Sequence, residues 1–165
     1  MAQHTIVPWP DKRLKTIATP VDNLTDETHA IWDEMIAVMD AMPGYGLAAT
    51  QLGILQRLAV VDCSETRGQA VRLANPKIVA QSDELFEWTE ASPNLPGVVA
   101  KLKRPARVTV AFMDETGETR EREFVDLWAT SVQHQIDHLN GMMFFDRLSR
   151  TKRQMLLKKA RKGMS

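Results

Sequence analysis

The sequence predicts a single α+β domain. An apolar pattern with helical spacing comes first, a run of short strand-like segments follows, and a second helical pattern comes after them. The 165 residues, 44% of them hydrophobic, suffice for one core, and no repeat or long linker divides them. We therefore expect residues 1–165 to form one domain.

The first helix is predicted to begin near Thr25 or Asp26 and to end at Met42. Acidic residues at its start favour the helix dipole, and Pro43-Gly44 stops it. An apolar stripe of this spacing is typical of a core-facing helix. The stripe consists of Ile31, Met35, Val38, Met39 and Met42.

The middle of the chain is predicted to supply strands, because short apolar runs alternate there with turn residues. They cover residues 57–62, 71–74, 77–80, 85–89 and 107–113. Residues 114–117 then predict a turn into a strand that ends near Phe124, which gives a hairpin.

The second helix is predicted to begin after Asp126 and to end at Gly141. At helical spacing its apolar and polar residues occupy opposite faces. The apolar face holds Trp128, Val132, Ile136 and Leu139, and the polar face holds Thr130, His134, Asp137 and His138. We therefore expect the histidines to face away from the core, toward a cleft or solvent.

Charge and cysteine content limit the setting of the protein. A net charge of zero gives no general attraction to nucleic acid or membrane, and we expect neither a membrane nor a specific DNA partner. No apolar run resembles a signal peptide or a membrane span. The single cysteine, Cys63, excludes an internal disulfide and fits a reducing compartment, so we expect a cytoplasmic protein.

The C-terminal segment is strongly basic and is predicted to form a helix at about residues 149–162. After Asp146 it contains eight cationic residues and no acidic one: Arg147, Arg150, Lys152, Arg153, Lys158, Lys159, Arg161 and Lys162. Such a helix could bind phosphate-rich RNA. It could equally be a solvated helix that is favoured by positive charge near its end.

The second helix carries a pair of histidines that could bind a metal ion. His134 and His138 are four residues apart, so both imidazoles share one face. In hydrolases with this spacing, a Glu after the first histidine takes a proton from metal-bound water. Gln135 stands there and cannot act as a base. The pair alone would also fit a solvated helix with two incidental histidines.

Three segments together resemble the signatures of peptide deformylases. Residues 44–51, Gly-Tyr-Gly-Leu-Ala-Ala-Thr-Gln, match the first, and residues 133–141, Gln-His-Gln-Ile-Asp-His-Leu-Asn-Gly, match the third. Residues 90–97, Glu-Ala-Ser-Pro-Asn-Leu-Pro-Gly, stand where the family has Glu-Gly-Cys-Leu-Ser. The resemblance covers essentially the whole chain. It implies antiparallel sheets packed around a central helix that bears the histidine pair.

The resemblance implies a degenerate metal site. Deformylases remove the formyl group from N-terminal methionine with a ferrous or zinc ion, held by two histidines and a cysteine. His134 and His138 match the histidine ligands, but Ser92 takes the place of the cysteine. A neutral hydroxyl is a much poorer ligand than a thiolate, so we expect no cofactor to bind tightly. Gln135 occupies the position of the general base.

The groups that stabilise the oxyanion are also altered. The family uses the side chain at the position of Gln51 and the backbone N–H of the residue after the cysteine. That residue is Pro93 here, and proline has no N–H. If the loop is shifted by one residue relative to the family, Pro93 does not occupy this position, and the loss of the N–H is less certain to affect the oxyanion.

The family's methionine pocket corresponds to a more polar set of residues in this chain. The predicted cleft comprises Tyr45, Gly46, Leu47, Leu95, Thr130 and Ser131. A polar pocket would bind methionine less well. Alternatively, Thr130 and Ser131 lie on a solvated helix face. Arg104 and Glu90 match positions where their pairing would be structural.

We therefore expect a catalytically inactive deformylase-like protein that keeps its cleft. It would bind an N-terminal peptide or a small amide, or dock on the ribosome through its basic C-terminal helix. The contrasting hypothesis is an active metal-dependent hydrolase that uses His134 and His138 and another group as base. Cys63 is expected to be a packed thiol and not a replacement ligand.

Overall fold

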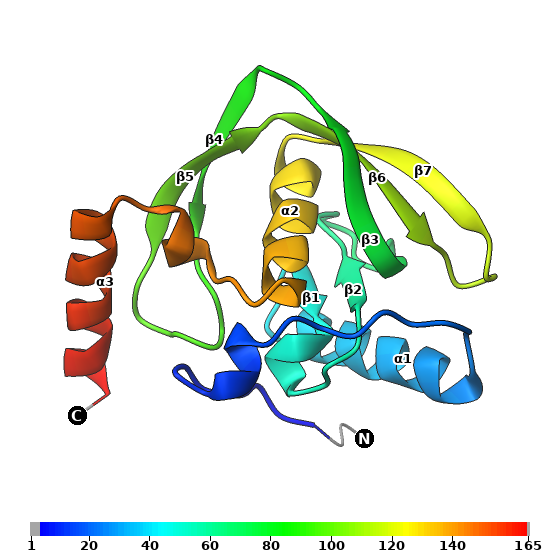
Figure 1. The fold of residues 1–165 in the computed structure, drawn as a ribbon, viewed down its shortest axis with the longest axis horizontal. Helices are drawn as coiled ribbons and strands as arrows, with labels where there is room; N and C mark the ends of the chain where they lie inside the picture. Colours follow the sequence, from blue (N-terminus) through cyan, green and yellow to red (C-terminus); the bar gives the residue numbers. More distant parts are fainter. Residues whose placement is uncertain (1–3, 165) are drawn as a thin grey trace.

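The computed structural model describes residues 4–164 and has two antiparallel sheets and three α-helices (Figure 1). The larger sheet has the strand order β1-β2-β3-β6-β7, and the smaller pairs β4 with β5. The strands are β1 (Gly46–Ala48), β2 (Leu58–Val61), β3 (Val71–Gln81), β4 (Leu85–Glu90), β5 (Ala100–Pro105), β6 (Arg107–Met113) and β7 (Thr119–Val125). The α-helices are α1 (Asp26–Ala41), α2 (Leu127–Leu139) and α3 (Arg150–Gly163).

Helix α1 begins and ends close to its predicted bounds. The Thr25 side chain accepts from the backbone N–H of Thr28, and the Thr28 hydroxyl reaches back to the backbone N–H of Thr25. Ile31, Met35 and Met39 are buried as predicted. The prediction was wrong for Met42, which is 37% exposed because it follows the last helical turn.

Five predicted strand segments match β2, β3, β4 and β6. The two segments predicted at 71–74 and 77–80 are one strand, β3, because a change of register at Asn75-Pro76 bends it without ending it. Asn75 has a φ of 52° and exchanges two side-chain hydrogen bonds with the backbone of Val21. The predicted hairpin is confirmed as β6 and β7.

Both faces of α2 are covered. The apolar side, with Val132, Ile136 and Leu139, packs against the five-stranded sheet. The other side contacts β4 and β5 and is also buried. Of the two expected settings for this polar face, a cleft or solvent, solvent was wrong. His134 and Asp137 are buried because they find charged partners on β4 and β5.

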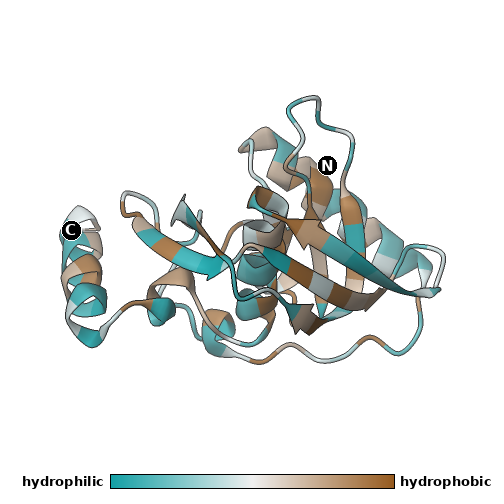
Figure 2. Cartoon of the chain, turned by 90° about the horizontal axis from the view of Figure 1, so that it is seen from above, coloured by the Kyte–Doolittle hydropathy of each residue, from teal (hydrophilic) through white to brown (hydrophobic). Residues whose placement is uncertain are grey.

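Helix α3 lies at one end of the molecule, on the side where β5 lies (Figures 1 and 2). Ser149 caps its N-terminus by accepting from the backbone N–H of Lys152 at 3.3 Å. Leu156 and Ala160 pack into a cluster that includes Trp9 and Phe145. Over the described residues, none of the helices has the length and apolar character needed to cross a membrane.

Candidate functional site

A cavity of about 390 Å³ lies between α2, β4 and the segment before β1. Its volume falls in the range of small-molecule sites. It is lined by Met42, Gly44, Tyr45, Gly46, Gln51, Trp88, Thr89, Glu90, Ala91, Ser92, Pro93, Leu127, Thr130, Ser131, His134 and Gln135. The cavity thus brings together most of the residues that the sequence suggested, from three separate parts of the chain.

Two residues of the predicted cleft do not line this cavity. Leu47 is fully buried against α1 and β2, and Leu95 is buried in the cluster beside α3. Both side chains point into the core, which the signatures alone could not indicate.

Trp88 was not anticipated as a wall of the cavity. Its ring lies edge-on to Tyr45, with centroids 6.3 Å apart, and stacks on Phe86 at 6.1 Å. The alternation along β4 places Trp88 and Glu90 on the same side of the strand. Once Glu90 had been assigned to the site, this alternation could have indicated from the sequence that Trp88 faces the cavity.

The two histidines of α2 converge. Their Nε2 atoms lie 3.2 Å apart, and His134 lines the cavity with His138 behind it. His138 is 1% exposed; burial holds the pKa of its imidazole well below the usual range, and the nearby His134 and Arg104 lower that pKa further. His138 is therefore neutral.

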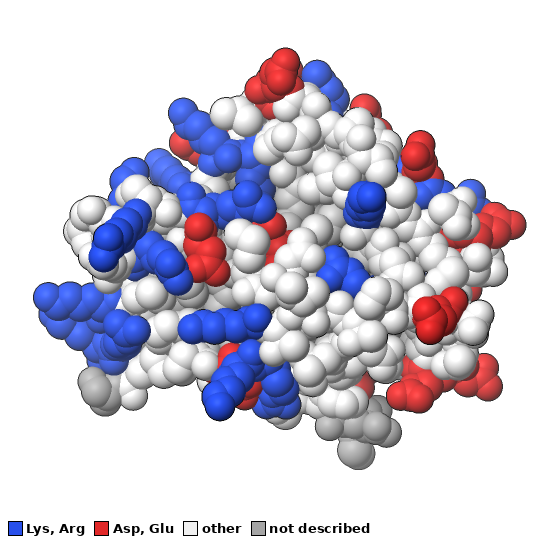
Figure 3. All heavy atoms as spheres, in the orientation of Figure 1, with Lys and Arg blue, Asp and Glu red and all other residues white. Residues whose placement is uncertain are grey.

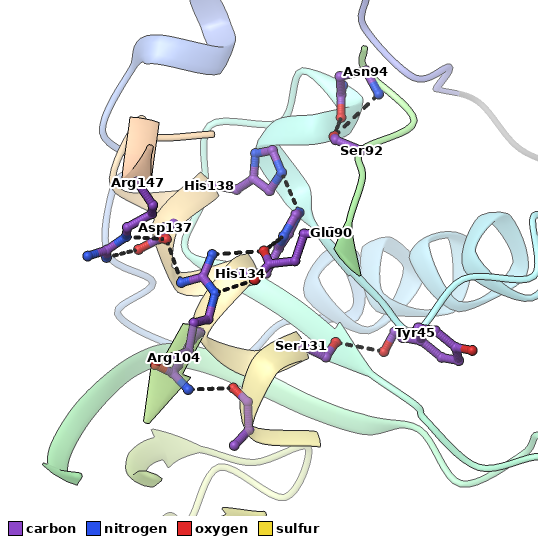
Figure 4. Close-up of polar contacts among 12 residues, drawn as sticks. Tyr45, Glu90, Ser92, Asn94, Arg104, Ser131, His134, Asp137, His138 and Arg147 are labelled. Carbon is purple, nitrogen blue, oxygen red and sulfur yellow. Dashed lines mark hydrogen bonds and ion pairs between the residues drawn. The ribbon is translucent and has the colours of Figure 1, made fainter. Parts of the chain in front are cut away.

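A chain of buried ion pairs orients His134 (Figure 4). Glu90 Oε1 lies 2.8 Å from His134 Nδ1, and Arg104 donates to both oxygens of Glu90, at 2.6 and 2.9 Å. Arg104 also donates to Asp137 at 2.9 Å, and Asp137 accepts from Arg147. The expected pairing of Arg104 with Glu90 is confirmed.

Glu90 remains ionised within this chain. Burial alone would raise the pKa of Glu90, but the hydrogen bonds to His134 and Arg104 outweigh burial and hold that pKa below its usual range. The ionised carboxylate can only accept a hydrogen bond, so Nδ1 of His134 is the donor, and Nε2 of His134 points at His138.

Ser92 and Gln51 are joined through Asn94, a residue that sequence reasoning missed. Asn94 Oδ1 accepts from Ser92 Oγ at 3.0 Å and from Gln51 Nε2 at 2.8 Å (Figure 4 shows the Ser92 contact). Its Nδ2 donates to the backbone oxygen of Val7 at 2.6 Å. The proposed oxyanion donor and the proposed third ligand therefore bond to the same side chain.

The metal-binding groups match the family only in part. With metal–nitrogen bonds of about 2.0–2.1 Å, two tetrahedral ligand nitrogens lie about 3.3 Å apart. The histidine pair fits that spacing. The third group is the neutral Ser92 hydroxyl, which donates to Asn94. Within residues 4–164, no three His, Cys, Asp or Glu side chains are grouped to hold an ion. The donor set therefore does not fit a three-ligand catalytic site.

Gln135 packs tightly against Gly46. A Cβ at Gly46 would lie 2.6 Å from Gln135 Nε2 and 2.5 Å from Ser131 Oγ, so only glycine fits there. Cys63 lies apart from the histidines, with Sγ 3.8 Å from the backbone oxygen of Tyr45. Burial raises the pKa of this thiol to about 12, which keeps it protonated and unsuited to metal binding.

The whole chain has close relatives among known proteins. A family model for polypeptide deformylase matches residues 3–154. A peptide deformylase from Hydrogenovibrio crunogenus is 42% identical, covering 100% of this chain and 97% of its own length. One from Methylocella silvestris is 40% identical, with 99% and 86% covered.

Solved structures agree with the sequence relatives. The peptide deformylase from Legionella pneumophila superposes with a TM-score of 0.91 at 34% identity, covering 99% of this chain and 96% of that one. The enzyme from Ehrlichia chaffeensis gives 0.90 at 31% identity, with 98% and 96% covered. The chain belongs to the polypeptide deformylase family, and the predicted fold class is confirmed.

Proposed function

We propose that this protein binds a short N-terminal peptide or a small amide in the cavity beside His134, and that it does not deformylate it. The main support for this proposal is the hydroxyl of Ser92. It stands where the family has a cysteine ligand, and it donates to Asn94. A serine hydroxyl is neutral and a far weaker ligand than a thiolate.

Two further replacements act independently of metal binding. Gln135 lines the cavity at the position of the general base, and loss of positioned proton transfer costs roughly 10² to 10⁴ in rate. Pro93 also lines the cavity and has no N–H, and loss of one oxyanion donor costs about 10² to 10³. Together they would make hydrolysis negligible even if an ion bound.

Ligand binding is supported by what the cavity retains. Its walls combine large apolar groups, Trp88 and Leu127, with a few inward polar ones, as in small-molecule sites. The buried ion pairs still orient His134. The Ehrlichia chaffeensis deformylase has been solved in complex with actinonin, so a related fold holds a small ligand.

The second candidate is an active, metal-dependent peptide deformylase. The comparisons favour this function over an inactive protein, because relatives named peptide deformylase match the chain from end to end. The 3.2 Å spacing of the histidine nitrogens also favours it. It would require His134 and His138 to be the only strong protein ligands and a base other than Gln135.

One experiment separates the two functions. The protein is purified without oxygen, supplied in turn with ferrous iron, nickel and zinc, and assayed on formyl-Met-Ala-Ser, with metal content and peptide binding measured on the same samples. Binding without turnover supports our proposal. Metal-dependent turnover that His134→Ala abolishes would establish the second candidate. Absence of both binding and turnover would contradict both.

We also propose that α3 docks on ribosomal RNA, which would place the protein in the cytoplasm. Lys and Arg side chains crowd the side of the molecule where α3 lies (Figure 3). Lys158 and Lys159 are exposed, whereas Leu156 packs into the core. Phosphate binding through such residues weakens with salt.

This docking is tested by co-sedimentation with ribosomes at low and moderate salt. Lys158→Gln with Lys159→Gln keeps the buried side of α3 intact and should reduce co-sedimentation. Equal co-sedimentation of the wild type and this variant at both salt concentrations would rule out the docking surface.

A further inference from the structure

Two polar atoms at the cavity are buried without a hydrogen-bond partner among residues 4–164: Thr130 Oγ1 and Gln135 Oε1. Both residues lie on α2 and line the cavity, with exposed fractions of 3% and 4%. An unpaired buried polar group costs free energy, and most buried polar groups are therefore paired. Two such atoms at one cavity point to a ligand that pairs with them.

Two neighbouring polar residues of the cavity, Ser131 and Gln51, are already hydrogen-bonded within the protein. Ser131 donates to the backbone oxygen of Tyr45 at 2.9 Å (Figure 4). Gln51 bonds to Asn94 and to the backbone N–H of Ala48. Unlike these two residues, Thr130 and Gln135 each have a buried side-chain oxygen without a hydrogen-bond partner among the described residues.

The charge of the lining restricts the ligand's end group. The residues that line the cavity include no lysine or arginine, and their one carboxylate, Glu90, is bound by Arg104 and His134. A charged end group would enter without a free counter-charge, at a large desolvation cost. The end group that fits is neutral and hydrogen-bonding.

The rest of the cavity wall is formed largely by Met42, Trp88 and Leu127, so the part of the ligand that precedes its end group should be apolar. Gln135 Oε1 can only accept, so the ligand must donate to it, whereas the Thr130 hydroxyl can donate or accept. The thioether of methionine is a weak acceptor and has no donor. A primary amide on an unbranched stem supplies both donors and an acceptor.

We propose that the cavity prefers a peptide whose first residue is glutamine over one that begins with methionine, with Thr130 as the specificity-determining residue. Glutamine has the same unbranched stem of two methylene groups as methionine and ends in a neutral amide. This inference rests on the proposed peptide-binding function and identifies the ligand class of that same cavity.

Titration calorimetry with three formylated peptides tests the preference: formyl-Gln-Ala-Ser, formyl-Met-Ala-Ser and formyl-norleucine-Ala-Ser, the last a purely apolar control. We expect the glutamine peptide to bind roughly tenfold or more tightly than the other two, because only it pairs with the buried oxygens. Thr130→Val, which keeps the side-chain shape, should remove most of this preference. Thr130→Ser, which keeps the hydroxyl, should retain it.

The outcomes separate this inference from the function on which it rests. If the three peptides bind alike, or methionine binds best, the preference is wrong while peptide binding stands. A preference that survives in Thr130→Val would exclude Thr130 as its source. If none of the peptides binds, peptide binding itself is wrong. Thermal unfolding of each variant shows that lost binding is not lost folding.

Discussion

Arg104 is a buried cation that joins two buried carboxylates. Its side chain is 5% exposed and lies between the carboxylates of Glu90 and Asp137, which are 3% and 6% exposed. Such a network is costly to bury and is tolerated because every partner is present. Its arrangement fixes the orientation of His134 at the cavity.

We predict that Arg104→Met lowers the free energy of unfolding by about 3–5 kcal/mol, because it removes the cation that binds both oxygens of the buried Glu90 and one of the two cations that bind Asp137. Urea unfolding measures the change. The matched control is Arg72→Met, which removes a 3.0 Å pair with a well-exposed Asp33 and should cost under about 1 kcal/mol. Equal losses in the two variants would mean that the buried network contributes no more than a surface pair.

Asp62 gives a prediction on pH. Burial alone would raise its pKa, but hydrogen bonds from the Ser64 hydroxyl and the backbone N–H groups of Ser64 and Gln69, with Arg67 nearby, lower that pKa overall. A carboxyl whose pKa is lowered by folding stabilises the protein above its unfolded pKa. That contribution is lost as pH falls through the lower, folded pKa.

We therefore predict that Asp62→Asn is less stable than the wild type by a constant amount from neutral pH down to about pH 4, the unfolded pKa of Asp. Below that pH the difference should shrink, since the wild-type carboxyl becomes protonated. Thermal or urea unfolding over this pH range measures it. A difference that persists unchanged into strong acid would show that the charge of Asp62 is not what stabilises the loop.

At the scale of single elements, the start of α1 depends on one side chain. Thr25 accepts from the backbone N–H of Thr28, which has no partner within the helix. We predict that Thr25→Ala lowers the free energy of unfolding by about 1 kcal/mol, measured by urea unfolding. Thr25→Ser keeps the capping oxygen and should change it by much less. An equal loss in the serine variant would attribute the effect to the methyl group instead.

The sequence predicted elements whose signals are local. The bounds of α1 follow from its cap and from Pro43-Gly44, and β6 was predicted residue for residue. Strand β5 was missed because its buried positions alternate Leu102 with the charged Arg104, which breaks the apolar pattern. Strand β1, three residues long, has no pattern to read.

The burial of the polar face of α2 could not be predicted from the sequence, for a different reason. His134 and Asp137 are buried because Glu90 and Arg104 reach them from β4 and β5. Such partners are far apart in sequence, so no periodicity within α2 reveals them. Resemblance located the histidines, Ser92 and Gln51, but not the role of Asn94, which depends on its contacts in the folded loop.

At the scale of the whole molecule, α2 connects its two sides. In Figure 1 it runs through the middle, with β3, β6 and β7 on one side and β5 and α3 on the other. The ion pairs from Arg147 through Asp137 and Arg104 to Glu90 run across α2 to the cavity. The family's framework is therefore retained around the cavity, which in this chain is lined by Ser92, Pro93 and Gln135.

The proposal that Ser92 is a weak ligand in this framework predicts that two substitutions strengthen metal binding. Ser92→Cys supplies a thiolate, and Gln135→Glu changes an amide into a carboxylate of nearly the same shape. Since the histidine nitrogens are already 3.2 Å apart, we expect the double variant to purify with more zinc than the wild type. Adding His138→Ala should abolish the gain, and metal content by mass spectrometry measures it.

Metal gained in this way should not by itself give full activity on a formyl-methionyl peptide. Gln51 remains bonded to Asn94, and Pro93 still lacks an N–H. Adding Pro93→Leu should therefore raise turnover of the double variant by about 10² to 10³, the worth of one oxyanion donor. A double variant that binds no more metal than the wild type would show that the framework itself has changed. Full activity without the Pro93 substitution would show that the loop backbone places another donor at the oxyanion.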